Sequence, residues 1–401
     1  MNQDQMFKII GKIDSDLIEN AENNVIKKRK FKYSRYIAVA ACMALIIGIS
    51  VILVSKKELP VITLDSILGE GYGPGESHLA YSIDEIVNEN PWNINSNIKH
   101  LPVIKNPLTF SIYGVENPDF EAMKLLLKNT ADKLGMDVEN LPIKDNTPDE
   151  RRKQQAIEQF KGIEDVPEEF LKPSCVFMQD EKYRVEVDKS MDVTVSFEPA
   201  VVLPEGYNFT YNASYQDLYK VAEYLLNEYK DYIGMKNPKI NISGGDYNFY
   251  GEKGYEIQIF DDTGDLAQKI INYNFNYVTF YCNKEGELDF SRYFKPNLDN
   301  VIGYYPIISK EKAFELLENK NYITSVCYDF PGTEYVKKIE IVYPNADSVK
   351  IFMPYYRILV QIPVDVIGID ENLNNYGAYY VPAVDGKYIE NLPVWDGEFN
   401  K

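Results

Sequence analysis

The residues best suited to acid–base or metal chemistry are two histidines, His78 and His100, which lie 22 positions apart. Neither belongs to an H-E-x-x-H motif, and neither lies near a cysteine in the sequence. A zinc centre needs three or four ligands with His or Cys among them, and a serine or cysteine nucleophile needs a positioned base. The sequence therefore predicts no catalytic residue, no metal site and no cofactor-binding site.

Two serines stand three positions before a lysine, in Ser96–Lys99 and Ser309–Lys312. A penicillin-binding enzyme would also carry S-D-N and K-T-G elements, and the sequence has neither. An apolar stripe at helical spacing follows Ser309, so this serine is predicted to cap a helix rather than to attack a substrate.

Carboxylates are abundant, and one cluster is the segment D-D-T-G-D, which contains Asp261, Asp262 and Asp265. The segment misses the D-x-[DN]-x-[DN]-G spacing of a calcium loop. A glycosidase needs two carboxylates that face each other, and adjacency in sequence does not provide that. We predict a solvated turn that caps the next helix, and a carboxylate hydrolase is the least favoured hypothesis for the chain.

An apolar segment near the amino end is the strongest signal of organisation. Residues 36–54 carry no charge, six basic residues lie within 27–35, and only Lys56 and Lys57 follow the segment directly. About 20 apolar residues cross a bilayer as a helix, and the more basic flank stays in the cytoplasm. The sequence predicts a single-pass cell-membrane protein with a cytoplasmic amino end and an extracellular remainder, and it disfavours a cleaved signal peptide or a lipid-modified Cys42.

Charge and cysteine content limit the classes of partner. The formal charge is −19 over 401 residues; residues 1–35 carry +3 and residues 55–401 carry −22. An exported region this acidic repels nucleic acid, so nucleic-acid binding is not expected. Cys175, Cys282 and Cys327 form a poor disulfide framework, and three buried free thiols are favoured over one bridge with one free thiol. The composition is typical of a low-GC Gram-positive bacterium.

The first 26 residues predict an amphipathic helix. Phe7, Ile10, Ile13 and Leu17 recur at helical spacing. One interpretation is a docking helix for a cytoplasmic partner protein, and the other is a lead-in that lies on the membrane surface.

The remaining pattern predicts an α+β fold in which helices pack on one face of antiparallel sheets. A helix followed by two strands is expected over 214–260 and again over 309–363. The chain is predicted to divide into five parts. They are a cytoplasmic tail (1–35), a transmembrane helix (36–54), a spacer (55–110), an α+β extracytoplasmic region (111–300) and a PepSY-like carboxy-terminal module (301–401).

Tyrosine pairs in the last module are candidate binding residues. Tyr355-Tyr356 and Tyr379-Tyr380 lie in predicted strands, where neighbouring side chains point to opposite faces. Each pair should then offer one buried and one exposed ring, and rows of exposed tyrosine suit peptide or glycan binding. Sheet propensity alone is the other explanation.

The stretch 308–363, a capped helix followed by a hairpin, resembles a PepSY-type module. The chain is also similar to uncharacterised membrane-anchored proteins of clostridia. The similarity rests on the terminal "YGAYYVPAV" and "LPVWDGEFN" and on the initial "IGKIDSDLIENA", which is followed by a basic cluster and an apolar anchor. Their amino ends are described as anti-sigma-factor-like, and the outer region also resembles YycI-type proteins, which restrain an envelope sensor kinase. The resemblance implies a protein partner from an envelope kinase or sigma-factor system. Residues 1–35 lack the zinc-binding His/Cys cluster of the usual anti-sigma domain.

These observations lead to two main hypotheses for function. The first is a non-catalytic, single-pass envelope regulator whose extracytoplasmic region senses or binds proteins. The alternative is an anchored module that binds a cell-wall or extracellular ligand and has no cytoplasmic role. The sequence predicts no particular oligomeric state.

Overall fold

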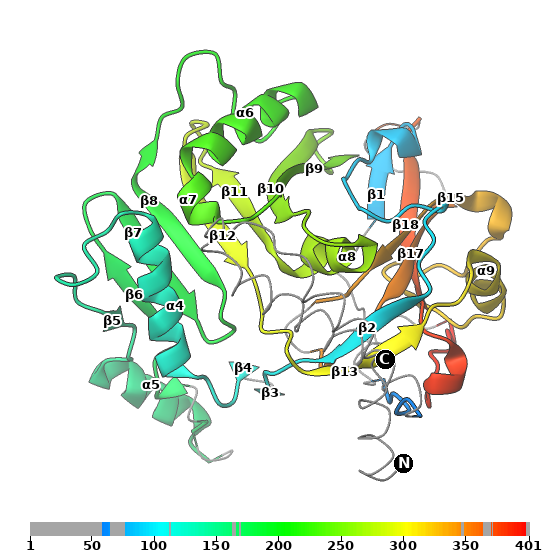
Figure 1. The fold of residues 1–401 in the computed structure, drawn as a ribbon, viewed down its shortest axis with the longest axis horizontal. Helices are drawn as coiled ribbons and strands as arrows, with labels where there is room; N and C mark the ends of the chain where they lie inside the picture. Colours follow the sequence, from blue (N-terminus) through cyan, green and yellow to red (C-terminus); the bar gives the residue numbers. More distant parts are fainter. Residues whose placement is uncertain are drawn as a thin grey trace, which may run out of the picture. The chain divides into compact units, whose positions relative to one another are not determined.

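A computed structural model gives the fold of most of the chain (Figure 1). It describes residues 58–64, 77–111, 114–162, 166–167, 170–345, 349–363, 370 and 372–397. Residues Leu59–Lys401 form one compact unit. The predicted membrane helix at 36–54 and the predicted tail helix with Phe7, Ile10, Ile13 and Leu17 lie outside the described residues.

The larger of two main sheets has eight strands, and each neighbouring pair is antiparallel. In spatial order the strands are β5 (Lys144–Asp145), β6 (Cys175–Gln179), β7 (Tyr183–Asp188), β8 (Val193–Val201), β12 (Leu288–Phe294), β11 (Tyr277–Cys282), β10 (Lys253–Asp261) and β9 (Pro238–Tyr247). Most of these strands alternate apolar and polar residues, as a sheet with one buried face requires.

Helices cover the apolar face of this sheet. They are α4 (Phe120–Lys133), α6 (Tyr215–Glu228) and the short α7 (Lys230–Ile233), while α5 (Glu150–Phe160) lies between β5 and β6 in the chain. Leu218, Val221 and Leu225 of α6 pack with Ile257 and Ile259 of β10 in one core. The helix expected at the start of the stretch 214–260, predicted as one long helix over 214–233, is present as two helices, α6 and α7, which meet at Tyr229.

Both ends of that helix follow from local chemistry. The Ser214 hydroxyl accepts a hydrogen bond from the Asp217 amide at 3.1 Å, which satisfies a donor that the first helical turn leaves free. Gly234 ends α7 with φ at 58°, a left-handed conformation that glycine adopts without a Cβ penalty.

The second main sheet has β1 (Ser77–Ala80), β18 (Asn374–Pro382), β17 (Tyr355–Ile362) and β15 (Val336–Val342) in spatial order, with β14 (Ile323–Thr324) also on β18. Its two faces are both buried. Tyr356 and Ile358 of β17 pack in a core that includes α8 (Leu266–Phe275) and α9 (Lys310–Glu318). Tyr355 and Leu359 pack in another core, which includes residues from the 59–103 region.

Smaller elements complete the unit. A third sheet has β13 (Val301–Pro306), β2 (His100–Lys105) and β16 (Ile351–Phe352), and β3 (Phe110–Ser111) pairs with β4 (Gly114–Val115). Short 3₁₀ helices are η2 (Ile83–Glu85), η4 (Thr333–Tyr335) and η5 (Gly386–Tyr388). Residues predicted as a spacer thus supply β1 and β2, which pair with strands from the end of the chain.

The predicted fold class, a transmembrane helix followed by PepSY-like helix–strand–strand units, is not the one observed. No helix in the described ranges combines the length and the apolar content that a bilayer crossing requires. The described residues also do not form repeated PepSY-like helix–strand–strand units. Strands β9 and β10 belong to the eight-stranded sheet, whereas the stretch 309–363 supplies strands to two other sheets. The observed fold is α+β, rich in strand, with several antiparallel sheets.

Two local predictions also need correction. The second strand expected in the stretch 309–363, predicted as one long strand over 350–364, is divided into β16 and β17, which belong to different sheets, and Pro354 lies at the division. Proline has no amide to donate to a ladder, so a strand interior disfavours it. Cys175 and Cys282 are buried free thiols as expected, but the free thiol of Cys327 is exposed.

Candidate ligand-binding cleft

A cleft of about 1560 Å³ is lined by residues of both main sheets. Its first wall is the polar face of β9 and β10, where Asn241, Ser243, Glu256 and Gln258 line the cleft. The intervening isoleucines of these strands point to the opposite, helix-covered face because strand side chains alternate. Strands β15, β17 and β18 supply the facing residues, which are Val342, Arg357, Leu359 and Tyr380.

Side-chain amides and tyrosines dominate the lining. The amides come from six asparagines and one glutamine, and the rings come from six tyrosines. They are Asn88, Asn212, Asn241, Asn248, Asn274, Asn345, Gln258, Tyr211, Tyr255, Tyr273, Tyr277, Tyr343 and Tyr380. An amide carries both donors and an acceptor, and a tyrosine carries a flat apolar ring with a hydroxyl. Some of these groups are used within the protein, since the Tyr343 hydroxyl donates to the Pro102 carbonyl and the Tyr211 hydroxyl to the Cys282 carbonyl.

The charges around the cleft balance. Asp246, Glu252 and Glu256 face Lys253, Lys284 and Arg357, whereas the whole chain has a formal charge of −19. The cleft is thus close to neutral within a strongly acidic protein.

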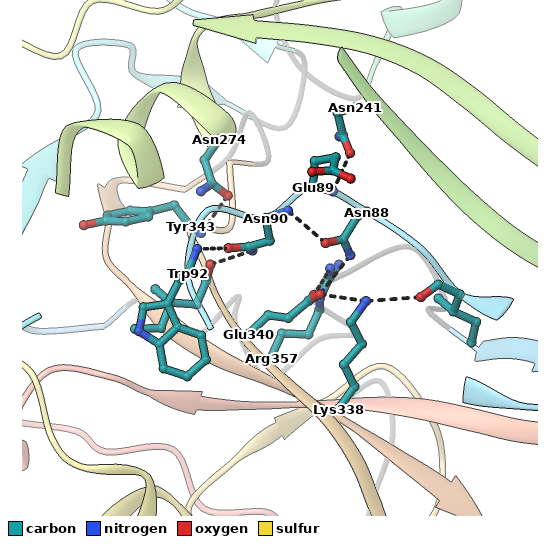
Figure 2. A network of polar contacts seen from close by, with 12 residues as sticks. Asn88, Glu89, Asn90, Trp92, Asn241, Asn274, Lys338, Glu340, Tyr343 and Arg357 are labelled. Carbon is teal, nitrogen blue, oxygen red and sulfur yellow. Dashed lines mark hydrogen bonds and ion pairs between the residues drawn. The ribbon is translucent and has the colours of Figure 1, made fainter. Parts of the chain in front are cut away.

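Residues 86–90, called the connector below, join the two main sheets beside the cleft (Figure 2). The Val87 amide donates to the Gly244 carbonyl at 2.9 Å, which extends the edge of β9. The Glu89 amide donates to Asn241 Oδ1 at 2.8 Å. On the other side, Asn90 Nδ2 donates to the Ile341 carbonyl of β15 at 3.0 Å. The connector therefore fixes the spacing of the two walls.

A buried ionic cluster lies next to the connector (Figure 2). Glu340 of β15 is 3% exposed and accepts from Arg357 at 2.5 Å, from Lys338 at 2.9 Å and from Asn88 Nδ2 at 2.9 Å. Burial opposes ionisation of Glu340, but Arg357 and Lys338 outweigh burial and lower the pKa of Glu340 to about 2. The cluster carries one net positive charge and holds Arg357 at the cleft.

The end of α8 and the strand β15 are also joined beside the cleft. The Tyr343 amide donates to Asn274 Oδ1 at 3.0 Å, and Asn345 Nδ2 donates to the Asn274 carbonyl at 3.1 Å. Asn274 Nδ2 in turn donates to the Ile270 carbonyl at 2.7 Å. Each amide is positioned by backbone partners, so this part of the lining is pre-organised.

The surroundings of two carboxyls of the cleft, Asp246 and Glu256, shift their pKa values in opposite directions. Burial alone would raise the pKa of Asp246, but the hydrogen bond and charge of His78, at 3.2 Å, outweigh burial and lower this pKa. Desolvation, and then the charge of Asp246, raise the pKa of Glu256. His78 belongs to β1 and Asp246 to β9, so this contact also links the two main sheets.

The tyrosine pairs do not provide the predicted exposed rings. Tyr355, Tyr356 and Tyr379 are at most 3% exposed, and Tyr380 is 7% exposed. Neighbouring rings do point to opposite faces, but each face carries its own core. The prediction of one exposed ring per pair is therefore wrong, although Tyr380 lines the cleft. The tail residues Phe7, Ile10, Ile13 and Leu17 lie outside the described part of the chain.

Other residues considered in the sequence have structural roles. Asp265 caps α8 by accepting from the Gln268 amide at 3.0 Å, and Asp262 pairs with Lys269 at 2.8 Å, which confirms the capping turn. Ser309 caps α9 by accepting from the Lys312 amide at 3.3 Å. His100 is an exposed residue of β2 and does not line the cleft.

Sequence reasoning missed the amide residues of the cleft. A local signal existed in β9 and β10, where Asn241, Ser243, Glu256 and Gln258 alternate with isoleucines. That pattern predicts a polar sheet face but does not say whether solvent or a second sheet faces it. The connector lies about 150 residues from β9 and about 250 from β15, so no local pattern relates them.

Comparisons with known proteins give the chain no family. No family model matches the sequence, and no curated protein matches it. Among solved structures, the chain is similar to an uncharacterised protein from Eubacterium rectale ATCC 33656, with 8% sequence identity and a TM-score of 0.33. That similarity covers 72% of this chain and 85% of the other, and at this level it carries no argument about fold or function.

Proposed function

We propose that the chain is a non-catalytic binding module that holds a neutral, polar ligand in the cleft. The lining of amides and tyrosines carries this proposal. Ligand sites place a few fixed polar groups among flat apolar surfaces, and tyrosine and asparagine together supply adaptable hydrogen bonds with rigid rings. This function corresponds to the ligand-binding hypothesis rather than to the envelope regulator.

The charge balance supports a neutral ligand. An anion would meet the field of a chain with a formal charge of −19. The three acidic and three basic residues at the cleft leave no excess of either charge there for an ionic ligand to pair with, which suits a neutral ligand. The predictions about the tail, an envelope kinase or sigma-factor partner and the membrane location concern residues outside the described ranges and stay predictions.

The proposal is tested by titrating the full-length chain with neutral probes in calorimetry. The probes are a hexamer of N-acetylglucosamine, maltohexaose and an uncharged hexapeptide. Ser243→Trp places a large ring inside the cleft, and Ser196→Trp places the same ring on the same polar sheet face, on β8, outside the cleft lining. We expect at least one probe to bind, with affinity at least tenfold weaker in the Ser243→Trp variant and unchanged in the Ser196→Trp variant. If no probe binds, or if both variants bind like the parent chain, the proposal is wrong.

A carboxylate hydrolase is the second candidate, because Glu256 and Asp246 line one cleft with pKa values shifted in opposite directions. Such divergence is how two carboxyls take the roles of acid and base. The binding module predicts that the N-acetylglucosamine hexamer stays intact on incubation with the chain. The hydrolase predicts cleavage products, which chromatography would detect and which the Glu256→Gln variant would no longer form.

A further inference from the structure

Two hairpins of the larger sheet use the same turn. The segments N-F-Y-G-E at 248–252 and N-K-E-G-E at 283–287 each begin with asparagine and end with glycine and glutamate. In each segment the backbone amide of the asparagine donates to the backbone carbonyl of the glutamate at 2.9 Å. The flanking residues pair across the two strands in the same register, as Tyr247 with Lys253 and Cys282 with Leu288.

The hydrogen bonds inside the two turns also match one by one. Asn248 Oδ1 accepts from the Tyr250 and Glu252 amides at 2.9 and 3.0 Å, and Asn248 Nδ2 donates to Glu252 Oε2 at 2.9 Å. In the second turn, Asn283 Oδ1 accepts from the Glu285 and Glu287 amides at 3.0 and 2.9 Å, and Asn283 Nδ2 donates to Glu287 Oε2 at 2.8 Å. The glycines have φ values of 73° and 78°, in the region that favours glycine. Asparagine, glycine and glutamate therefore specify the turn.

The two middle positions differ in chemistry. The second turn carries Lys284 and Glu285, which suit a hydrated loop, whereas the first carries Phe249 and Tyr250. These rings are 86% and 89% exposed. The second turn forms the same hydrogen bonds without aromatic residues. This hydrogen-bonded frame of asparagine, glycine and glutamate therefore does not need the two rings. Each aromatic side chain can bury about 150–250 Å² in a contact, and here that area faces solvent.

The aromatic turn is continuous with the cleft. Asn248 and Glu252 of the same turn line the cleft, as does Tyr211, whose ring is 65% exposed. Strands β9 and β11 run in the same direction, since each is antiparallel to β10, so both turns lie at the same end of the sheet. The hydrogen-bonded frame therefore holds Phe249 and Tyr250 at the rim of the cleft.

We propose that Phe249 and Tyr250 form an aromatic platform that extends the cleft and contacts the apolar faces of sugar rings in a neutral glycan. This inference rests on the proposed function. A sugar ring has apolar C–H faces and a rim of hydroxyls, so it matches exposed aromatic rings next to an amide-lined cleft. The lining is better matched to hydroxyls than to an aliphatic peptide side chain, because it has seven side-chain amides and only Ile86, Val87, Val342, Pro344 and Leu359 are aliphatic or proline.

A membrane surface is the main competing partner for two exposed rings at a turn. Peripheral membrane segments usually combine aromatic residues with Lys and Arg, which attract anionic lipid. Here Glu252 offsets the neighbouring Lys253, Lys284 is the one basic residue of the second turn, and the whole chain has a formal charge of −19. The charge distribution therefore favours the neutral glycan.

The decisive variant exchanges the aromatic pair for the pair in the second turn, as the double change Phe249→Lys and Tyr250→Glu. The melting temperature should match that of the parent chain, because the frame is the same. Calorimetry of the full-length chain with N-acetylglucosamine oligomers should show about tenfold weaker binding of the hexamer. Binding of the dimer, which has two sugar rings rather than six, should be weakened less than binding of the hexamer.

The other outcomes separate the two proposals. If the hexapeptide binds and the oligosaccharides do not, the glycan assignment is wrong and the binding module stands. If Ser243→Trp abolishes hexamer binding but the turn exchange does not change it, the platform is wrong and the cleft stands. If phosphatidylcholine vesicles co-sediment with the parent chain but not with the exchanged variant, and hexamer affinity is equal in both, the rings bind membrane. If no probe binds, both proposals are wrong.

Discussion

At the scale of single residues, Glu340 is the polar group with the most demanding surroundings. Its carboxylate is buried with Lys338 and Arg357, and Asn88 of the connector bonds to it. Charged groups are retained in such places only when their partners remain. The same contacts hold Arg357 at the cleft, so stability and site geometry depend on one carboxylate.

We predict that Glu340→Gln lowers the free energy of unfolding by about 2–4 kcal/mol, since two partly buried cations lose their counter-charge. Urea unfolding at pH 7 measures this loss. The matched control is Glu334→Gln, which removes the charge of an exposed glutamate just before β15 and should change stability by less than about 0.5 kcal/mol. Equal effects of the two variants would contradict the role of Glu340.

The same residue predicts an acid dependence. The folded pKa of Glu340 is about 2, below the ordinary value of 4.5, so the unfolded chain binds the proton more tightly. The stabilisation is complete above about pH 4.5 and is lost as the pH falls toward 2. Urea unfolding between pH 5 and 3 should therefore show a smaller loss of stability in Glu340→Gln than in the parent chain. Parallel losses would show that other groups control acid unfolding.

At the scale of elements, the connector determines how the two main sheets meet. It has no regular secondary structure of its own, and its backbone and asparagine side chains bond to β9 on one side and β15 on the other. Asn241 is the central partner, because it accepts from the Glu89 amide and donates to Gln258 at 2.8 Å.

We predict that Asn241→Ala lowers stability by about 1–3 kcal/mol, because the Glu89 amide loses its acceptor. The amide of Glu89 should also exchange hydrogen faster, while amides within α6 should not. Asn140→Ala is the control, since Asn140 bonds to Asp137 in an exposed turn. Unchanged exchange at Glu89 would show that the connector is held by its other contacts.

At the scale of the whole molecule, the ends of the described unit are interdependent. The β1 strand pairs with β18, and β2 pairs with β13 and β16. The core under the second sheet includes α8, which lies before the predicted carboxy-terminal module in the sequence. Segments far apart in the chain must therefore assemble together.

We predict that a fragment of residues 301–401 does not fold by itself, because it lacks β1, β2 and α8. Circular dichroism during heating measures this. The full-length chain should unfold cooperatively, and the fragment should show no cooperative transition. A cooperative transition in the fragment would support the predicted independent module.

Local chemistry was sufficient for much of the secondary structure. Ser214 and Gly234 delimit the helical stretch of α6 and α7, Asp265 and Ser309 cap α8 and α9, and apolar alternation predicts β9 and β10. These features depend on neighbours within a few residues, so the sequence alone predicts them.

The burial of the tyrosines and the existence of the cleft could not be predicted in that way. Tyr356 and Tyr379 are buried because helices cover a face that strand periodicity alone leaves open. Asn241 lines the cleft and holds the connector because Glu89, 152 positions earlier, lies against it. Such contacts arise when separate sheets pack together, and one chain's local periodicity carries no information about which faces will meet.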